Sequence, residues 1–335
     1  MRRREFITLL GTAAAGQSLP FIRVSHSEAM RKRPVIAWLG AVWNSGMPDL
    51  VRENTFRSFL RGMSDLGYVR DQDYDFLVLN KIFPDPVPVL EELVTRIRPD
   101  VIVASATWEA VAIRKATSSI PIVCPAMADG VHLGLIVSEA HPGGNVTGLE
   151  PYLGGLPTKQ MELIREVVPR AKRVGLLVDM ADPKGPPQLW DLRTASQAFG
   201  LELVTVNTST SDEILGALDN LSANKVDAVV VLMTALLLQT SDKIAAMALE
   251  RRLPTICGYR EHVLVGSLIS YGVDLRWIYH RAAYVVDRIL KGAKPADLPI
   301  EFPTGLLLAV NLRTAKALGV TLPPSLLARA DELIE

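Results

Sequence analysis

The segment His141-Pro-Gly-Gly-Asn-Val-Thr-Gly148 divides the chain into two runs of alternating strand and helix patterns. Its three glycines and one proline cannot sustain a helix, and glycine supplies the backbone conformations that a sharp turn needs. A second segment, Gly266-Ser-Leu-Ile-Ser-Tyr-Gly272, ends the second run and precedes a long amphipathic helix. Either segment alone also fits an ordinary strand-to-helix connection. Together they predict two crossovers between two lobes, with Gly148 and Gly272 as hinge residues and a cleft between the lobes.

The patterns on both sides of this segment predict an α/β fold. Continuous apolar runs such as Val35–Leu39 are typical of strands buried in a parallel sheet, and amphipathic helices separate them. Regular alternation with right-handed connections makes each lobe a doubly wound parallel sheet. The expected strands are 35–39, 74–79, 101–104 and one ending at 124 in the first lobe, and 173–178, 201–207, 228–232, 255–257 and 267–270 in the second, followed by 306–311.

The same patterns set the expected domain boundaries. Residues 34–148 form the first lobe and residues 149–272 form the second. A helix over residues 277–291 is expected to return to the first lobe. Residues 293–335 then supply a third pass through the hinge and a C-terminal strand and helix. Three passes permit the lobes to bend toward each other and resist twisting.

Length and composition fit two cores and argue against several classes of function. With 335 residues, 49% of them hydrophobic, the chain can bury two cores. Its formal charge of +0 argues against a nucleic-acid partner, which would need a basic face. The histidines are scattered, so neither a metal site nor a cofactor is predicted. Cys124 and Cys257 end equivalent strands in separate cores and are expected to be free thiols.

Residues 1–29 have the pattern of an export signal. A basic start precedes a modest apolar core from Phe6 to Ala15, which is too short to span a bilayer. Small residues at Ser27 and Ala29 predict cleavage near Ala29. The run Arg3-Arg4-Glu5-Phe6-Ile7 matches the twin-arginine type of signal, and an ordinary Sec signal with additional arginines is the alternative. Both alternatives predict a mature protein in the periplasm.

Several segments carry a family resemblance that covers essentially the whole chain. They are the twin-arginine start, His141–Gly148, Gly266-Ser-Leu-Ile-Ser-Tyr-Gly-Val-Asp-Leu275, Ile289-Leu-Lys-Gly-Ala-Lys-Pro-Ala-Asp-Leu-Pro299 and Leu312-Arg-Thr-Ala-Lys-Ala-Leu-Gly-Val-Thr-Leu-Pro-Pro-Ser-Leu-Leu327. They closely resemble the substrate-binding proteins of ABC transporters of the tryptophan/tyrosine-binding-like type. The resemblance implies the type I periplasmic-binding-protein fold, in which three crossings join two α/β lobes. It also implies a small-molecule ligand that is held in the cleft and delivered to an ABC permease in the inner membrane.

The chain departs from the family pattern at positions that flank the expected cleft. It has Asp179-Met180 where the family often has Asn-Pro, and Cys257 where a tyrosine is frequent. It has Thr107-Trp108 where the family commonly has Thr-Pro. The ligand of a characterised relative therefore cannot be transferred to this chain.

The residues that follow each strand are the candidate ligand site, because open α/β sheets bind ligands beyond the carboxyl ends of their strands. The predicted ligand-binding residues are Asn44, Ser45, Ser105, Thr107, Trp108, Met127 and Asp129 in the first lobe, and Asp179, Thr234, Tyr259, Glu261 and Tyr271 in the second. Trp43 adds a further aromatic surface beside them.

These residue types favour a small organic carboxylate. Ser105 and Thr107 can cap the helix that follows them, with its first-turn amides facing the cleft, and such amides attract a carboxylate. The aromatic rings can stack on an aromatic or apolar body. Asp129, Asp179 and Glu261 can pair with an ammonium, so an amino acid is the alternative ligand. Each residue also has an ordinary explanation as a helix cap, a core side chain or a solvated loop residue.

No catalytic motif accompanies the candidate site. The sequence has no nucleophile-elbow, P-loop or H-E-x-x-H pattern, and no dinucleotide-binding glycine pattern follows a strand. No catalytic residue is therefore predicted, and the protein is not expected to be an enzyme. The predicted function is that of a monomeric, periplasmic solute-binding component of an ABC importer. Two alternatives stay open, a ligand-sensing module for a membrane kinase and a secreted α/β enzyme.

Overall fold

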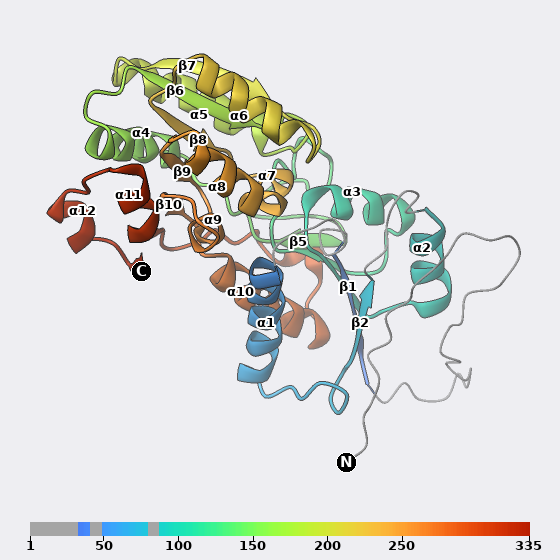
Figure 1. Cartoon of the computed structure of the whole chain (residues 1–335). Coiled ribbons are helices and arrows are strands. Elements are labelled where there is room, and N and C mark those ends of the chain that lie inside the picture. Colours follow the sequence, from blue (N-terminus) through green and yellow to red (C-terminus); the bar gives the residue numbers. More distant parts are fainter. Residues whose placement is uncertain (1–32, 41–48, 80–86) are drawn as a thin grey trace, which may run out of the picture. The chain divides into compact units, whose positions relative to one another are not determined.

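The computed structural model describes residues 33–40, 49–79 and 87–335 and shows an α/β fold built on two sheets (Figure 1). The first sheet has five strands, all parallel, in the order β2 (Asp75–Leu79), β1 (Val35–Leu39), β3 (Val101–Ala104), β4 (Ile122–Cys124) and β5 (Val146–Gly148). The second has seven strands in the order β12 (Glu332–Ile334), β11 (Leu307–Asn311), β10 (Ile269–Gly272), β9 (Thr255–Cys257), β8 (Ala228–Val231), β6 (Arg173–Val178) and β7 (Glu202–Asn207). This architecture confirms the predicted α/β fold class.

The five strands predicted for the second lobe are parallel, and the later strand β11 joins the edge of their sheet in the opposite direction. β11 runs antiparallel to β10, with Tyr271 opposite Leu308. The reversal follows from the connectivity: β10 ends where the chain leaves the second sheet, and β11 begins where the chain returns to it. β12 is parallel to β11 and was not predicted, because Glu332–Ile334 is too short to show a pattern of alternating residues.

The segment 141–148 is not itself a crossover, in contrast to the prediction. Its last residues form β5, the edge strand of the first sheet, in which Gly148 lies opposite Cys124. The crossing begins at Leu149, which forms a bridge with Glu301 of the third crossing. The amide of Glu301 donates to the carbonyl oxygen of Gly148 at 3.1 Å. The chain crosses after β5, after β10 and before β11, and the first and third crossings are hydrogen-bonded to each other.

The helix after the second crossing packs on the first sheet's helical layer. α10 (Leu275–Leu290) lies along α1 (Asp49–Asp65), as Figure 1 shows. A Cβ on Gly62 of α1 would lie 2.5 Å from the carbonyl oxygen of His280, so glycine permits this close packing. The further helices are α2 (Val87–Glu92, continued by a π-helical turn over Leu93–Ile97), α3 (Thr107–Ala116), α4 (Leu156–Val167), α5 (Gly185–Ala198), α6 (Glu213–Ala223), α7 (Ala235–Gln239), α8 (Ser241–Glu250), α9 (Arg260–Leu264), α11 (Leu312–Leu318) and α12 (Pro324–Ala328).

The two cysteines are buried free thiols, as predicted. Cys124 ends β4 and Cys257 ends β9. Burial raises the pKa of Cys257 to about 12, so this thiol stays protonated at neutral pH.

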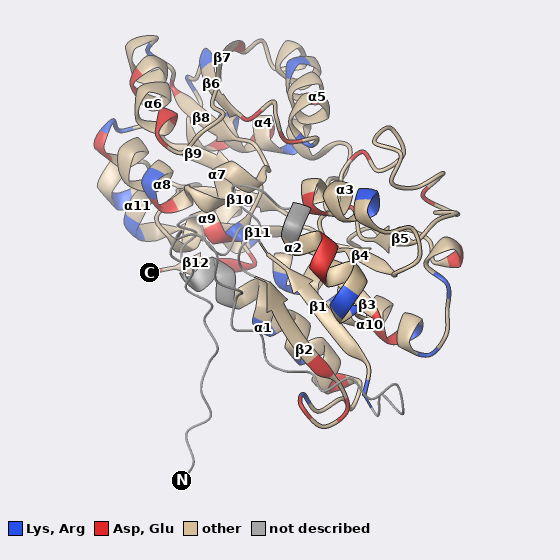
Figure 2. Cartoon of the chain, turned by 90° about the vertical axis from the view of Figure 1, so that its right-hand side faces the viewer, with Lys and Arg blue, Asp and Glu red and all other residues tan. Residues whose placement is uncertain are grey.

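Charged residues of both signs are interspersed along the described helices (Figure 2). None of the helices within the described ranges has the length and apolar character that crossing a bilayer requires.

Gly148 and Gly272 end the strands from which the chain leaves each sheet, and both positions require glycine. A Cβ on Gly148 would lie 2.0 Å from the carbonyl oxygen of Cys124, and the φ angle of Gly148 is +153°. A Cβ on Gly272 would lie 1.9 Å from the carbonyl oxygen of Gly258, the residue after β9. In both sheets, the strand that leads into a crossing therefore packs backbone against backbone on its neighbour.

Replacing Gly148 with alanine is expected to destabilise the protein by at least about 1–3 kcal/mol, because the backbone of β4 or β5 must move to admit the methyl group. Gly144 in the same segment is the matched control, since a Cβ there meets nothing within 4 Å. Gly144→Ala should change the stability by less than about 1 kcal/mol. Urea unfolding measures both variants, and equal unfolding midpoints would contradict the packing argument.

Candidate functional site

A cavity of about 40 Å³ lies between the two sheets. The first sheet, its loops and α1 contribute Trp38, Thr55, Ser105, Ala106 and Ala126. The loops of the second sheet and α7 contribute Lys184, Thr234, Ala235, Leu238 and Tyr259. Leu275 and Tyr279 of α10 complete the lining. Most of these residues follow the carboxyl ends of strands, which is where α/β sheets bind ligands.

Lys184 places a buried positive charge at this cavity. Its side chain is 5% exposed, and its Nζ lies 3.9 Å from Oδ2 of Asp182, too far for a direct hydrogen bond. Burial alone would lower the pKa of Lys184, but the negative charges of Asp182 and Glu150 contribute to a net raised pKa. The ammonium therefore stays charged at neutral pH. Asp182 balances this charge without a direct hydrogen bond to the ammonium.

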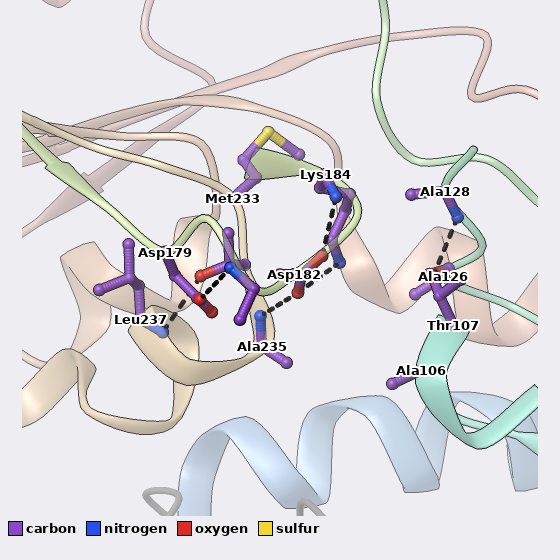
Figure 3. A network of polar contacts seen from close by, with 12 residues as sticks. Ala106, Thr107, Ala126, Ala128, Asp179, Asp182, Lys184, Met233, Ala235 and Leu237 are labelled. Carbon is purple, nitrogen blue, oxygen red and sulfur yellow. Dashed lines mark hydrogen bonds and ion pairs between the residues drawn. The ribbon is translucent and has the colours of Figure 1, made fainter. Parts of the chain in front are cut away.

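Backbone amides hold the carboxylate of Asp182, which makes no direct hydrogen bond with the ammonium of Lys184 (Figure 3). Its Oδ1 accepts from the amide of Lys184 at 2.9 Å, and its Oδ2 accepts from the amide of Ala235 at 2.9 Å. Asp182 is also tied to its own loop, since its carbonyl oxygen accepts from the amide of Gly185 at 2.8 Å. One side chain thus joins the loop after β6 to the start of α7.

Gln188 of α5 holds the same two loops from the other side. Its Nε2 donates to the carbonyl oxygens of Lys184 and Met233 at 2.8 and 3.2 Å, and its Oε1 accepts from the amide of Met233 at 2.8 Å. Gln188 is buried, so water has little access to these bonds. Lys184 and the cavity residue Thr234, which follows Met233, are therefore positioned together.

The prediction that Ser105 and Thr107 cap the helix after β3 is wrong. The N-cap residue of α3 is Ala106, and its amide donates to Oε2 of Glu109 at 3.1 Å. The hydroxyl of Ser105 donates to the same oxygen at 2.9 Å. Glu109, the third residue of the helix, thus accepts from the N-cap amide and from the hydroxyl of Ser105, so this hydroxyl acts as a donor to Glu109 and not as a cap.

Thr107 instead joins two loops of the first sheet (Figure 3). Its Oγ1 donates to the carbonyl oxygen of Ala126 at 3.2 Å and accepts from the amide of Ala128 at 3.0 Å. Thr107 is 3% exposed. Its hydroxyl therefore holds the segment after β4 against the turn after β3, and this side of the cavity owes its shape to that contact.

Aromatic rings supply much of the apolar lining. Trp38 and Tyr279 have ring centroids 5.7 Å apart, and the hydroxyl of Tyr279 donates to the carbonyl oxygen of Ser105 at 3.1 Å. Tyr259 approaches from the second sheet and is 2% exposed. Burial raises the pKa of Tyr259, while the charge of Lys184 and a hydrogen bond with it act in the opposite direction. The cavity thus combines one cationic group with rings from both sheets.

A family model described as ABC transporter substrate binding protein matches residues 52–334 of the chain. The chain belongs to this family. Over 284 residues it is 28% identical to the tyrosine-binding protein of Clostridioides difficile (strain R20291), and these residues cover 83% of this chain and 81% of that protein.

Solved structures share the fold of this substrate-binding protein. The ABC domain from Streptococcus pneumoniae in complex with L-Trp aligns with a TM-score of 0.80 and 24% identity, over 90% of this chain and 100% of that chain. A conserved domain protein from Vibrio cholerae aligns with a TM-score of 0.80 and 26% identity, over 90% of this chain and 99% of that chain. The similarity confirms the expected type I periplasmic-binding-protein fold.

The structure brings three of the predicted ligand-binding residues of this substrate-binding protein to the cavity. They are Ser105, Thr234 and Tyr259. Thr234 is the N-cap residue of α7, and its hydroxyl oxygen accepts from the amide of Leu237 at 3.4 Å. Asn44 and Ser45, like Trp43, lie outside the described residues.

The other predicted residues that the structure describes do not line the cavity. Met127 is buried in the core of the first lobe, and Trp108 packs against that core. Asp129 is exposed, whereas Asp179 is buried and its Oδ1 accepts from the amide of Ala181 at 3.1 Å. Thr107, Glu261 and Tyr271 complete this group, and Tyr271 is a half-buried residue of β10.

Of the nine cavity residues that were not predicted, Lys184 and Trp38 bear most on the chemistry of the site. Lys184 lies beyond the first residues after β6, which are the only ones that a search at strand ends considers. Its amide donates to Asp182 and its carbonyl oxygen accepts from Gln188, and these bonds hold it at the cavity. Its sequence signal is the turn Asp182-Pro-Lys-Gly185, a pair of opposite charges after a strand. Trp38 lies inside β1, where an apolar run predicts only a core residue.

Glu261 is a buried carboxyl group two residues from the cavity residue Tyr259. It is 0% exposed, and both of its oxygens lack a hydrogen-bond partner among the residues that the structure describes. Burial is the main cause that raises the pKa of Glu261 to about 7, and Asp274 acts in the same direction. The neighbouring His262 is also fully buried, and burial lowers its pKa to about 4. α9 therefore buries a neutral histidine and a carboxyl group that is partly protonated near neutral pH.

Glu261→Gln is expected to gain stability relative to the wild type as the pH rises from about 4.5 to about 7. Over this range the folded wild type keeps a proton on Glu261 that the unfolded chain releases, so its stability falls, whereas glutamine has no proton to lose. The difference should grow by up to about 3 kcal/mol, at about 1.4 kcal/mol per pKa unit. Urea unfolding at several pH values measures it, with His262 acting equally in both proteins. A difference that stays constant with pH would contradict the assignment.

Proposed function

We propose that this protein is the periplasmic solute-binding component of an ABC importer, which closes its lobes around a small organic carboxylate and delivers it to a permease. The family membership supports a ligand-binding role. The single observation that carries the carboxylate is the buried ammonium of Lys184, which lines the cavity and lies 3.9 Å from the nearest oxygen of Asp182. A ligand carboxylate can accept charge-assisted hydrogen bonds from this group.

The body of the ligand is proposed to be aromatic or apolar, and an amino acid is included in this class. Trp38, Tyr259 and Tyr279 present rings to the cavity, and rings of this kind favour offset or edge-on contacts with another ring. The relative from Clostridioides difficile is a tyrosine-binding protein, and the structure from Streptococcus pneumoniae contains L-Trp. Both ligands are carboxylates with an aromatic body, which agrees with the proposed chemistry.

Binding is proposed to require that the two lobes separate and close again. A cavity of about 40 Å³ is smaller than the cavities of roughly 150 Å³ that hold benzene, so an aromatic acid cannot enter it as it stands. Gly148 and Gly272, where the chain leaves the two sheets, are the proposed hinge residues. The protein is proposed to act as a monomer without catalysis, so that the solute is released unchanged.

Lys184→Met is expected to weaken the binding of a carboxylate by about 10- to 100-fold, since a hydrogen bond to a charged group contributes about 1.5–3 kcal/mol. L-Tyrosine, L-tryptophan and 4-hydroxybenzoate are screened first by thermal shift, and each binder is then measured by calorimetry. Lys243→Met is the matched control, because Lys243 is an exposed residue of α8. The corresponding carboxamides should lose less affinity than the carboxylates in the Lys184 variant.

Equal affinity of the wild type and Lys184→Met for every carboxylate would refute the assignment of Lys184. Chemical conversion of a bound compound, in place of its intact recovery, would refute the non-catalytic function. Uptake of the bound compound by cells that lack the gene, at the rate of the parent strain, would argue against import and in favour of a sensing role.

Export is proposed to use the twin-arginine signal of residues 1–29, with cleavage near Ala29. Replacing both Arg3 and Arg4 with lysine should leave the precursor in the cytoplasm, because this pathway reads the arginine pair. Arg2→Lys, which preserves the pair, is the control and should be exported normally. Cell fractionation and immunoblotting measure the outcome, and continued processing of the double variant would point to a Sec signal instead.

A further inference from the structure

Trp38 lines the cavity and has an indole N–H that finds no acceptor among the described residues. It lies in β1, is 0% exposed and lines the same cavity as Lys184. Its Nε1 is buried and has no hydrogen-bond partner within the described ranges. A buried indole N–H usually has a partner, because it loses its hydrogen bond to water on burial. We infer that the indole N–H of Trp38 donates to the ligand's carboxylate together with Lys184, so that one carboxylate bridges the two lobes.

The surroundings of Trp38 hold its ring in place without supplying an acceptor. Phe56, Phe59 and Phe76 pack around the indole with centroid distances of 5.6, 5.2 and 6.2 Å, and none of them carries an oxygen. The fourth ring belongs to Tyr279, whose hydroxyl donates to the carbonyl oxygen of Ser105 at 3.1 Å. The indole is therefore held by packing against four rings, and Trp38 lines the cavity.

The size and charge of the cavity favour one shared anionic group. Its volume of about 40 Å³ admits a group of a few heavy atoms, since a single water needs roughly 10–15 Å³ on this measure. Among the described residues that line it, Lys184 is the only one with a charged side chain. A carboxylate has two oxygens, so it can accept from the ammonium of Lys184 and from Nε1 of Trp38 at the same time.

This arrangement couples the binding of the carboxylate to closure. Lys184 belongs to a loop of the second sheet and Trp38 to the first sheet, so a single carboxylate meets both donors only when the lobes are closed. A ligand shifts a conformational equilibrium by its differential affinity for the two states. Lys184 alone would bind the carboxylate in either state. The added bond from Trp38 is made in the closed state and is the part that favours closure.

The test removes the indole N–H of Trp38 while keeping an aromatic ring at this position. The NMR signal of the indole in the wild type gives a second, independent measurement. Trp38→Phe removes the N–H, and Trp190→Phe is the matched control because Trp190 is 68% exposed on α5. The protein is labelled with 15N at the indole nitrogens, and the Trp38 signal is the one that Trp38→Phe lacks. This inference rests on the proposed function, so the probes are L-tyrosine and 4-hydroxybenzoate, with tyramine and phenol as the counterparts without a carboxylate.

On binding of L-tyrosine or 4-hydroxybenzoate, the Trp38 indole proton should move downfield and exchange more slowly with water. Trp38→Phe should bind these carboxylates about 5- to 30-fold more weakly, while Trp190→Phe should bind them as the wild type does. Because both donors hold the same group, the effects of Trp38→Phe and Lys184→Met should be non-additive in the double variant. The effect of Trp38→Phe should disappear for tyramine and phenol.

The possible outcomes separate this inference from the proposed function. If the wild type binds neither carboxylate, the proposed ligand class fails and the inference fails with it. If the wild type binds a carboxylate through Lys184 while Trp38→Phe keeps full affinity and the indole signal does not move, the inference alone is overturned. If Trp38→Phe does not fold, the indole shift in the wild type decides, with the Trp38 signal assigned by its contacts to the Phe59 ring.

Discussion

Two backbone contacts fix where the chain can leave each sheet, and the site depends on them. Gly148 lies against Cys124, and Gly272 lies against Gly258, so closely that no side chain fits at either glycine. Both contacts occur at the carboxyl ends of strands, and the crossings therefore start at the edge where the cavity lies. The hydrogen bonds between the first and third crossings, at Glu150 and Glu301, make these two segments one unit that must bend together.

The second constraint is electrostatic. A charge as deeply buried as that of Lys184 is tolerated only when opposite charge is nearby. Asp182 supplies it from a position that amides enforce, and Glu150 of the first crossing adds to it when its carboxyl group is ionised. Burial raises the pKa of Glu150 to about 8, although Lys184 acts to lower it. Near neutral pH Glu150 can therefore hold a proton, and Asp182 is the main source of negative charge beside Lys184.

The sequence was most informative where a residue's environment is set by its neighbours in the chain. The apolar runs 101–104 and 228–232 predicted central strands. The direction of β11 and the existence of β12 depend on how the returning chain enters the second sheet, which no local pattern encodes. The fold class could therefore be predicted, whereas one edge of the second sheet could not.

In the candidate site too, local sequence patterns predicted some residues, whereas others depend on the tertiary structure. Ser105, Thr234 and Tyr259 come directly after strands, and the strand-end rule placed them at the cavity. The role of Thr107 could not be predicted, because its hydroxyl bonds to Ala126 and Ala128, which belong to the loop after a different strand. Lys184 bonds to its chain neighbours Asp182 and Gln188, and these two are held in turn by Ala235 and Met233 farther along the chain. The role of Lys184 is therefore a property of the tertiary structure.

The small volume of the cavity has a consequence for how specificity is divided. About 40 Å³ accommodates the head group of a ligand, so the donors that face it discriminate charge and geometry at one end of the molecule only. Under the proposed function, the body contacts surfaces that become available when the lobes part, and its fit is tested as they close again. Selection of the head group and selection of the body would then be successive steps of one motion. A ligand with the right carboxylate and a body that blocks closure would bind the second lobe and gain nothing from the first.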